Sequence, residues 1–176
     1  MTAPMDLILV ALSGIVLFLP ALIPNSAAVL FGGGTPVDFG RTWKGKRILG
    51  DGKTWRGLVG GVSAGIAFGL ILIALFELVP SNFPDYGEWP QSVGVVVTLA
   101  FGSLLGDMAG AFIKRRLGME RGQKAPILDQ YDFVAGALLL TALFHPSWVA
   151  STYINGDGIV ALIVLLVFVP LLHRSV

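Results

Sequence analysis

Residues 102–133 read GSLLGDMAGAFIKRRLGMERGQKAPILDQYDF, and this stretch combines a membrane-like segment with an unusual charge cluster. Its apolar, glycine-rich first part contains Asp107, and the next apolar segment opens with Asp129 and Asp132. The cations between them are Lys114, Arg115, Arg116, Arg121 and Lys124. Ionisable groups are costly inside a bilayer and mark functional sites there. Carboxylates beside cations suit a metal-bound polyphosphate, because carboxylates bind Mg²⁺ and cations bind phosphate oxygens.

The composition indicates an integral membrane protein. The 176 residues have a mean hydropathy of +0.79 and only 13% are charged, whereas a soluble domain carries roughly a quarter. The chain has no cysteine, which excludes disulfides and thiolate metal sites. We therefore expect a single transmembrane domain over residues 1–176.

Five apolar segments approach the ~20 residues that a bilayer core requires. We place them at 5–31, 55–79, 91–113, 132–152 and 157–173. They predict an all-α fold with five transmembrane helices. Pro20 and Pro24 are expected to kink or break the first helix.

The distribution of cations predicts the orientation. All twelve Lys and Arg residues lie in 32–56, in 114–128 or at Arg174, and the connections near 80–90 and 153–156 have none. Five spans put all twelve on one side of the membrane. The positive-inside rule makes these basic loops cytoplasmic and puts the N-terminus outside. Topology alone could also explain the basic loops, but not an intramembrane aspartate.

Asp107 and Lys114 are seven residues apart and share one face of a helix. Gly102, Gly106 and Gly110 follow a neighbouring face and would let another helix approach closely. We expect Asp107 to face a protein interior or a wet cavity. The alternative is a purely structural aspartate paired with a lysine or a backbone amide.

Asp129 and Asp132 have i,i+3 spacing, which puts both on one face of the first turn of a helix. Two carboxylates so placed can bind Mg²⁺ together with phosphate oxygens. Helix N-capping explains Asp129 equally well and Asp132 less well. The residues alone leave metal binding and capping open.

The first basic loop is rich in glycine and resembles an anion-binding loop only superficially. GDGKT at 50–54 lacks the GxxxxGK[ST] pattern, and no strand precedes it. Asn25, which follows Pro24 in the first span, could offer directional hydrogen bonds in a cavity or simply belong to a bent helix. The stripe Gly57, Gly61, Gly65 and Gly69 is interpreted as helix packing.

Together these pieces resemble the CDP-archaeol synthases, the archaeal branch of the enzymes that include CDP-diacylglycerol synthases. The matching pieces are Pro24-Asn25, GGTPVDFG at 33–40, LGDGKTWRG at 49–57, the KRR at 114–116 and DQYD at 129–132. The resemblance covers about residues 24–140. The chain has no HGG run, and Gln130 stands where bacterial-type relatives have arginine, which favours the archaeal branch.

The resemblance implies a Mg²⁺-dependent cytidylyltransferase of the cell membrane. CTP and an ether-linked lipid phosphate, 2,3-bis-O-geranylgeranylglycerol 1-phosphate, would give CDP-archaeol and pyrophosphate. Asp129 and Asp132 match the family's metal-binding carboxylates, and Lys114 and Arg115 match its KR element. We expect Asp107 to assist the metal, and no nucleic acid to be a partner; the oligomeric state stays open.

The remaining expectations concern substrate binding. Lys53, Arg56 and Lys124 should share the triphosphate and the lipid phosphate with Lys114 and Arg115. Asn25, Gly33 and Gly34 are weaker candidates for the cytidine. Two other functions compete: a CTP-dependent polyprenol-type lipid kinase, which would release CDP, and a non-enzymatic membrane transporter or scaffold. The absence of an internal repeat and the one-sided charges count against a transporter.

Overall fold

The protein is a bundle of long helices with one small hairpin. The structure, a computed structural model, describes residues 7–78, 84–120 and 122–174, so Arg121 and parts of the first and second expected segments lie outside the described residues. Its elements are α1 (Leu7–Phe31), β1 (Thr42–Trp43), β2 (Lys46–Arg47), α2 (Trp55–Phe76), α3 (Gln91–Arg116), α4 (Pro126–Phe144), α5 (Pro146–Val149), the π-helix η1 (Ala150–Ile154) and α6 (Gly158–Arg174). The sequence did not predict the β1–β2 hairpin.

Four helices, α1 to α4, are long and apolar enough to cross a membrane. The segments Pro146–Ile154 and Gly158–Leu172 add a fifth candidate if they are one span, although they are bent by 81° relative to each other. The described part of the chain therefore has four or five candidate spans. Helix α1 continues through Pro20 and Pro24, so the prolines do not end it.

The fourth helix differs from the expected segment 132–152 at both ends. It begins six residues earlier, with Pro126 in its first turn, a position that suits proline's fixed φ angle. It ends at Phe144 because His145 precedes Pro146, and the residue before a proline avoids helical geometry. As a result Asp129 lies in the first turn and Asp132 one turn later.

Glycines allow the helices to approach closely, as their spacing predicted. A Cβ atom at Gly61 or Gly65 of α2 would lie 2.7 Å from the carbonyl oxygen of Pro24 or Pro20 on α1. On α3, a Cβ at Gly102 would lie 2.7 Å from the carbonyl oxygen of Gly136 on α4. The glycine stripes therefore serve packing between α1 and α2 and between α3 and α4.

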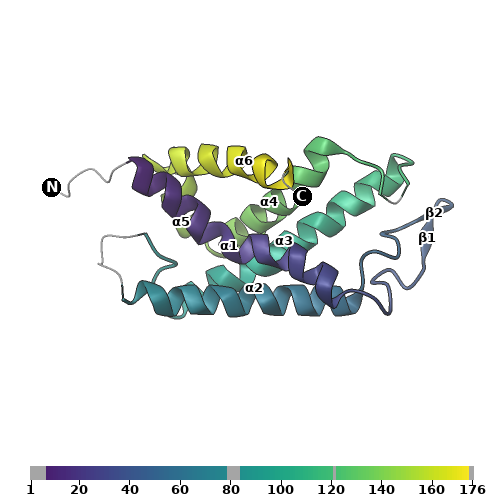
Figure 1. Cartoon of the computed structure of the whole chain (residues 1–176), viewed down its shortest axis with the longest axis horizontal. Coiled ribbons are helices and arrows are strands. Elements are labelled where there is room, and N and C mark those ends of the chain that lie inside the picture. The colour runs from purple at the N-terminus through teal and green to yellow at the C-terminus, as the bar shows by residue number, and fades with distance from the viewer. Residues whose placement is uncertain (1–6, 79–83, 121, 175–176) are drawn as a thin grey trace.

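Figure 1 shows α2 and α6 on opposite sides of the bundle, with α1, α3 and α4 crossing between them. The core is apolar and includes Leu17, Phe18, Leu99 and Leu165, all fully buried. The hairpin, the end of α3 and the start of α4 lie at one end of the bundle in Figure 1, and the start of α1 lies at the other. This arrangement brings the two main basic connections together.

Candidate active site

The segment between α1 and α2 folds back on itself at the start of α2. Val37 N donates to Lys53 O (2.8 Å), and Trp55 N donates to Thr35 O (3.1 Å). Thr54 is the N-cap of α2, and its hydroxyl accepts a hydrogen bond from Gly57 N (3.2 Å). These bonds fix Lys53 immediately before the N-cap of a membrane helix.

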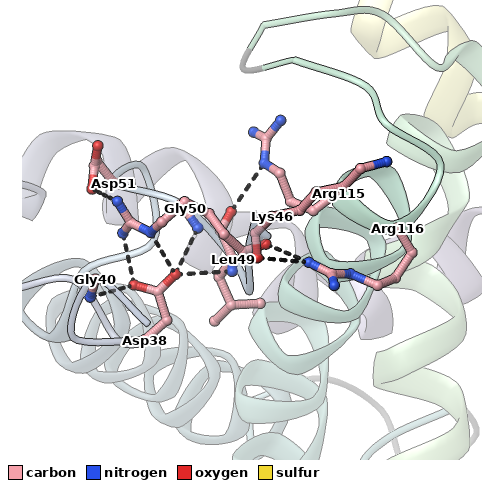
Figure 2. Close-up of polar contacts among 9 residues, drawn as sticks. Asp38, Gly40, Lys46, Leu49, Gly50, Asp51, Arg115 and Arg116 are labelled. Atoms are coloured by element: carbon pink, nitrogen blue, oxygen red, sulfur yellow. Dashed lines mark hydrogen bonds and ion pairs between the residues drawn. The ribbon is translucent and has the colours of Figure 1, made fainter. Parts of the chain in front are cut away.

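Asp38 is the centre of this segment, although the sequence analysis assigned no separate role to it (Figure 2). Its carboxylate oxygens accept hydrogen bonds from five donors: Gly40 N (3.0 Å), Leu49 N (3.0 Å), Gly50 N (3.0 Å), Arg47 Nε (3.3 Å) and Arg47 Nη2 (2.8 Å). Arg47 also contacts Asp51 through Nη1 (2.7 Å). The Asp38-x-Gly40 pattern, typical of an Asx turn, was the only local signal.

The pKa of Asp38 lies well below its usual range. Burial alone would raise this pKa, but the hydrogen bonds from Arg47 and from the backbone amides of Gly50, Leu49 and Gly40 outweigh burial. Asp38 therefore stays ionised at any pH at which the protein would be assayed.

Two arginines at the end of α3 attach this segment to the bundle (Figure 2). Arg116 donates to the carbonyl oxygens of Trp43 (2.6 Å), Lys46 (3.2 Å) and Arg47 (2.6 Å). Its guanidinium also lies 5.4 Å from the ring centroid of Trp43. Arg115 donates to Leu49 O (3.5 Å) and Met119 O (2.6 Å). Part of the expected cation cluster is therefore structural.

Two ion pairs connect distant parts of the chain at the same end of the bundle. Lys53 Nζ pairs with Asp107 Oδ2, and Lys114 Nζ pairs with Asp129 Oδ1 (2.6 Å). Asp129 Oδ2 also accepts a hydrogen bond from Ala125 N (2.8 Å), the N-cap residue of α4. Asp129 is thus not the N-cap residue, but its carboxylate satisfies the N-cap amide.

Two cavities adjoin at these pairs. The first, which we call the Asn25 cavity, has a volume of about 340 Å³ and is lined by parts of α1, α2 and α3 and by the segment that connects α1 to α2. The second, the Asp132 cavity, has a volume of about 200 Å³ and includes Asp107, Lys114, Arg115 and Asp132. Gly52, Lys53 and Asp107 line both cavities. The Lys53–Asp107 pair therefore lies at the boundary between them.

Asp132 occupies space that two glycines of α3 leave open. A Cβ at Gly110 would lie 2.0 Å from Asp132 Oδ2, and one at Gly106 would lie 2.1 Å from Asp132 O. Asp107 and Asp129 act on the Asp132 carboxylate as nearby like charges, and Lys53 acts as a nearby opposite charge. Carboxylates of two different helices, Asp107 of α3 and Asp129 and Asp132 of α4, thus belong to one electrostatic cluster.

The acidic residues can be tested for their fit to Mg²⁺. Within the described ranges, no three His, Asp or Glu side chains form a group that could hold a metal. Mg²⁺ usually takes one or two carboxylates and completes its octahedral shell with water and substrate phosphates. Asp107 and Asp132 satisfy that requirement because both line the Asp132 cavity. They fit an ion that arrives with a polyphosphate.

The other expected site residues are spread around these cavities. Asn25 and Gly33 line the Asn25 cavity, and Asn25 Nδ2 donates to Ser103 Oγ (3.3 Å). Arg56 lies outside both cavities, in a groove of about 390 Å³ with Phe31, Trp55 and Val59. A Cβ at Gly34 would lie 3.3 Å from Arg56 Cδ. Lys124 is exposed and lines neither cavity.

Comparison with known proteins identifies consistent relatives. The family model "CarS-like: CDP-archaeol synthase" matches residues 5–176. The CDP-archaeol synthase of Methanospirillum hungatei is 53% identical over 161 residues, covering 90% of this chain and 91% of that protein. The CDP-archaeol synthase of Halobacterium salinarum is 45% identical, covering 96% and 91%. A solved structure of an intramembrane enzyme for archaeal membrane lipids biosynthesis matches with a TM-score of 0.70 and 38% identity, covering 94% of this chain and 92% of that chain.

Proposed function

Because this chain belongs to the CDP-archaeol synthase family, we propose that the Asn25 cavity and the Asp132 cavity together form its active site. The enzyme is a multi-pass membrane cytidylyltransferase of lipid biosynthesis. It transfers the cytidylyl group of CTP to an archaeal ether-lipid phosphate and releases pyrophosphate. The observation that carries the site assignment is the Lys53–Asp107 pair, which lies at the boundary of both cavities.

The reaction requires positioning and charge neutralisation more than a strong base. The lipid phosphate that attacks the α-phosphorus of CTP is already anionic at neutral pH. In-line geometry and fixed positive charge therefore account for most of the catalysis. Lys53 is suited to the phosphates at the boundary, and Lys114 and Arg115 are suited to the leaving pyrophosphate in the Asp132 cavity.

The cytidine is assigned to the Asn25 cavity. Asn25 provides an amide at its wall, and the backbone of Gly32 and Gly33 is accessible from the same space. A side chain at Gly33 would meet no atom within 4 Å, which leaves room for a ligand against this backbone. Nucleotide base and triphosphate would then lie on opposite sides of Lys53.

Because Asp107 and Asp132 line the same cavity, they are the proposed Mg²⁺ ligands. Asp129 belongs to the same cluster of carboxylates and would contribute its negative charge. When bound, the ion would neutralise charge on the phosphates of CTP. Asp129 keeps Lys114 in place through their ion pair. This proposal moves the main metal pair from Asp129 and Asp132 to Asp107 and Asp132.

We further propose five spans, with the basic end of the bundle cytoplasmic and the N-terminus outside. All Lys and Arg residues then lie on the side where CTP is available. The groove beside Arg56 is apolar except for that guanidinium, so it suits a two-tailed lipid phosphate that approaches from the bilayer. Gly34, which lies against Arg56, follows Gly33 of the Asn25 cavity.

The test is product analysis with purified protein, CTP, Mg²⁺ and the ether-linked lipid phosphate. The expected products are pyrophosphate and a CDP-lipid of matching mass, both absent without lipid or without divalent cation. Release of CDP with a phosphorylated lipid alcohol would support the kinase alternative instead. Turnover that persists in EDTA would contradict the metal assignment without affecting the cytidylyl transfer.

A further inference from the structure

The carboxylate of Asp38 is only 1% exposed and lines neither cavity, so it does not reach the substrates. Its five hydrogen bonds nevertheless exceed what a surface turn requires. A buried charge is costly unless it is hydrogen-bonded and paired. Such a charge outside the active site indicates that the segment it organises must hold one particular conformation.

The hydrogen bonds lead from Asp38 to Lys53. Asp38 Oδ2 accepts from the amides of Leu49 and Gly50, and Gly50 O accepts from Lys53 N (3.3 Å). On the other side, Val37 N, adjacent to Asp38, donates to Lys53 O (2.8 Å). The backbone of Lys53 is therefore bonded on both sides to residues that Asp38 holds or adjoins. The Lys53 side chain then reaches Asp107 on α3.

We propose that Asp38 is a positioning residue, whose carboxylate fixes the turn at 49–53 and thereby places the Lys53 ammonium between the two cavities. This rests on the proposed function. Arg47 is the second part of the device, because it binds both Asp38 and Asp51 and so links the middle of the turn to the carboxylate that fixes it. The planar guanidinium can donate two hydrogen bonds at once to a carboxylate, whereas a lysine ammonium acts as a point charge.

Asp38→Asn is the appropriate variant because it changes almost no volume. One oxygen becomes an NH₂ group, so donors would face donors whichever way the amide is oriented, and the side chain loses at least two of its five hydrogen bonds, including at least one from Arg47. We expect kcat to fall about tenfold or more, since small misplacements of a positioned group cost that much. Asp157→Asn, an exposed aspartate at the other end of the bundle, is the charge-matched control and should change kcat less than twofold.

The decisive measurement is a double-mutant cycle with Lys53→Ala. If Asp38 acts through Lys53, Asp38→Asn lowers kcat about tenfold in the wild-type background and less than twofold when Lys53 is already alanine. A loss that is equally large in both backgrounds would overturn the proposal, because it would mean general damage. The assay must therefore detect the residual activity of Lys53→Ala.

Trypsin cleavage after Lys53 gives a readout that does not depend on activity. We expect faster cleavage there in Asp38→Asn than in the wild type or in Asp157→Asn. Unchanged cleavage together with unchanged kcat would reject the positioning role. If wild-type protein forms no CDP-lipid but the variant is still cut faster, the proposed function fails while the ordering of the turn by Asp38 stands.

If Asp38→Asn does not fold, Arg47→Lys replaces it in the same cycle. This variant keeps the charge but loses the two-pronged contact with Asp38 and the contact with Asp51. We expect a smaller loss of kcat, roughly threefold, which again disappears in the Lys53→Ala background. A loss that persists in that background would reject the proposal.

Discussion

The two ends of the bundle both have cavities lined with carboxylates, but among the described residues only the cavities at one end are lined by Lys or Arg. At the end where the chain begins, Asp85 and Asp157 line a cavity of about 580 Å³, larger than either cavity of the proposed active site. No Lys or Arg is among the described residues that line it. At the basic end, the carboxylates of Asp107 and Asp129 pair with lysines. Cavity size and acidity alone therefore do not distinguish a polyphosphate site.

The partners of the carboxylates differ in the same way. Asp85 Oδ1 accepts a hydrogen bond from Gly87 N (2.7 Å), two residues away, and its backbone oxygen accepts from Trp148 Nε1 (2.9 Å). These contacts shape a turn. Asp107 instead contacts a lysine 54 positions earlier in the sequence, in the loop just before α2. Long-range charge pairing at a cavity wall is the feature that separates the proposed active site from the opposite cavity.

The largest expected difference between the two ends concerns carboxylate neutralisation. Asp132→Asn should leave a folded protein but lower turnover by at least about a hundredfold, because it removes one of two proposed metal ligands. Asp157→Asn should change turnover less than twofold. CDP-lipid formation at saturating CTP and Mg²⁺ measures both. Near-native activity in Asp132→Asn would contradict the metal assignment. The carboxylate of Asp132 would then matter no more to turnover than that of Asp157 at the opposite end.

A second comparison separates packing from function by using one glycine at each end. In Gly110→Ala the new methyl group would overlap the Asp132 carboxylate, whereas in Gly14→Ala it would meet Ala161 Cβ of α6 at 2.5 Å. Both substitutions overpack a helix contact and should cost about 1–3 kcal/mol of stability. Only Gly110→Ala should also lower kcat per folded molecule, by more than tenfold. Equal kcat values for the two variants would contradict the placement of Asp132 against α3.

Much of the helical framework could be predicted because hydrophobic length and glycine spacing are local signals. The first three expected segments match α1, α2 and α3 to within three residues at each described end, since α2 ends at Phe76 and α3 continues to Arg116, and the glycine stripes do pack. The fourth segment was predicted wrongly at both ends. Hydrophobicity does not show that a helix begins at Pro126, and the prediction did not take into account that Pro146 would end the helix. The span count and the orientation stay predictions.

The contacts within the site were harder to predict because they join distant positions. Helical periodicity put Asp107 and Lys114 on one face, and both do line the Asp132 cavity. It could not show that Asp107 pairs with Lys53 rather than with Lys114, since that depends on how α2 packs against α3. Asp38 was missed for the same reason, because most of its donors are 9–12 residues away.

The cations of the basic end should differ among themselves. Lys114→Ala breaks the pair with Asp129 and removes a charge from the Asp132 cavity, so kcat/KM for CTP should fall about tenfold. Lys124→Ala removes an exposed charge that lines neither cavity, and kcat/KM should fall less than threefold. Initial rates over a range of CTP concentrations measure both. Similar losses would mean that the basic loops act as a diffuse field rather than through particular contacts.

The smallest effect concerns pH. We expect the stabilisation that Asp38 contributes to stay the same across the pH range of the assays. Asp38→Asn should lower the unfolding midpoint by roughly 4–8 °C, since it leaves buried donors unsatisfied. The folded pKa of Asp38 is depressed below its ordinary value of 3.8, so its stabilisation is fully present above that value and is lost only as the pH falls toward the folded pKa. The difference in midpoint between wild type and variant should therefore be constant from about pH 5 to 8 and shrink below about pH 4.

Thermal unfolding in detergent at several pH values tests this expectation, with Asp157→Asn as the reference for an exposed aspartate. A difference that changed between pH 5 and 8 would mean that a group titrating in that range, and not the Asp38 carboxylate, controls the turn at 49–53. A constant difference would show instead that the turn carrying Lys53 is held by a charge that assay pH does not alter. Any change of turnover with pH in that range would then arise at the cavities or in the phosphates bound there, since the second pKa of a phosphate monoester is about 6, and not at the turn.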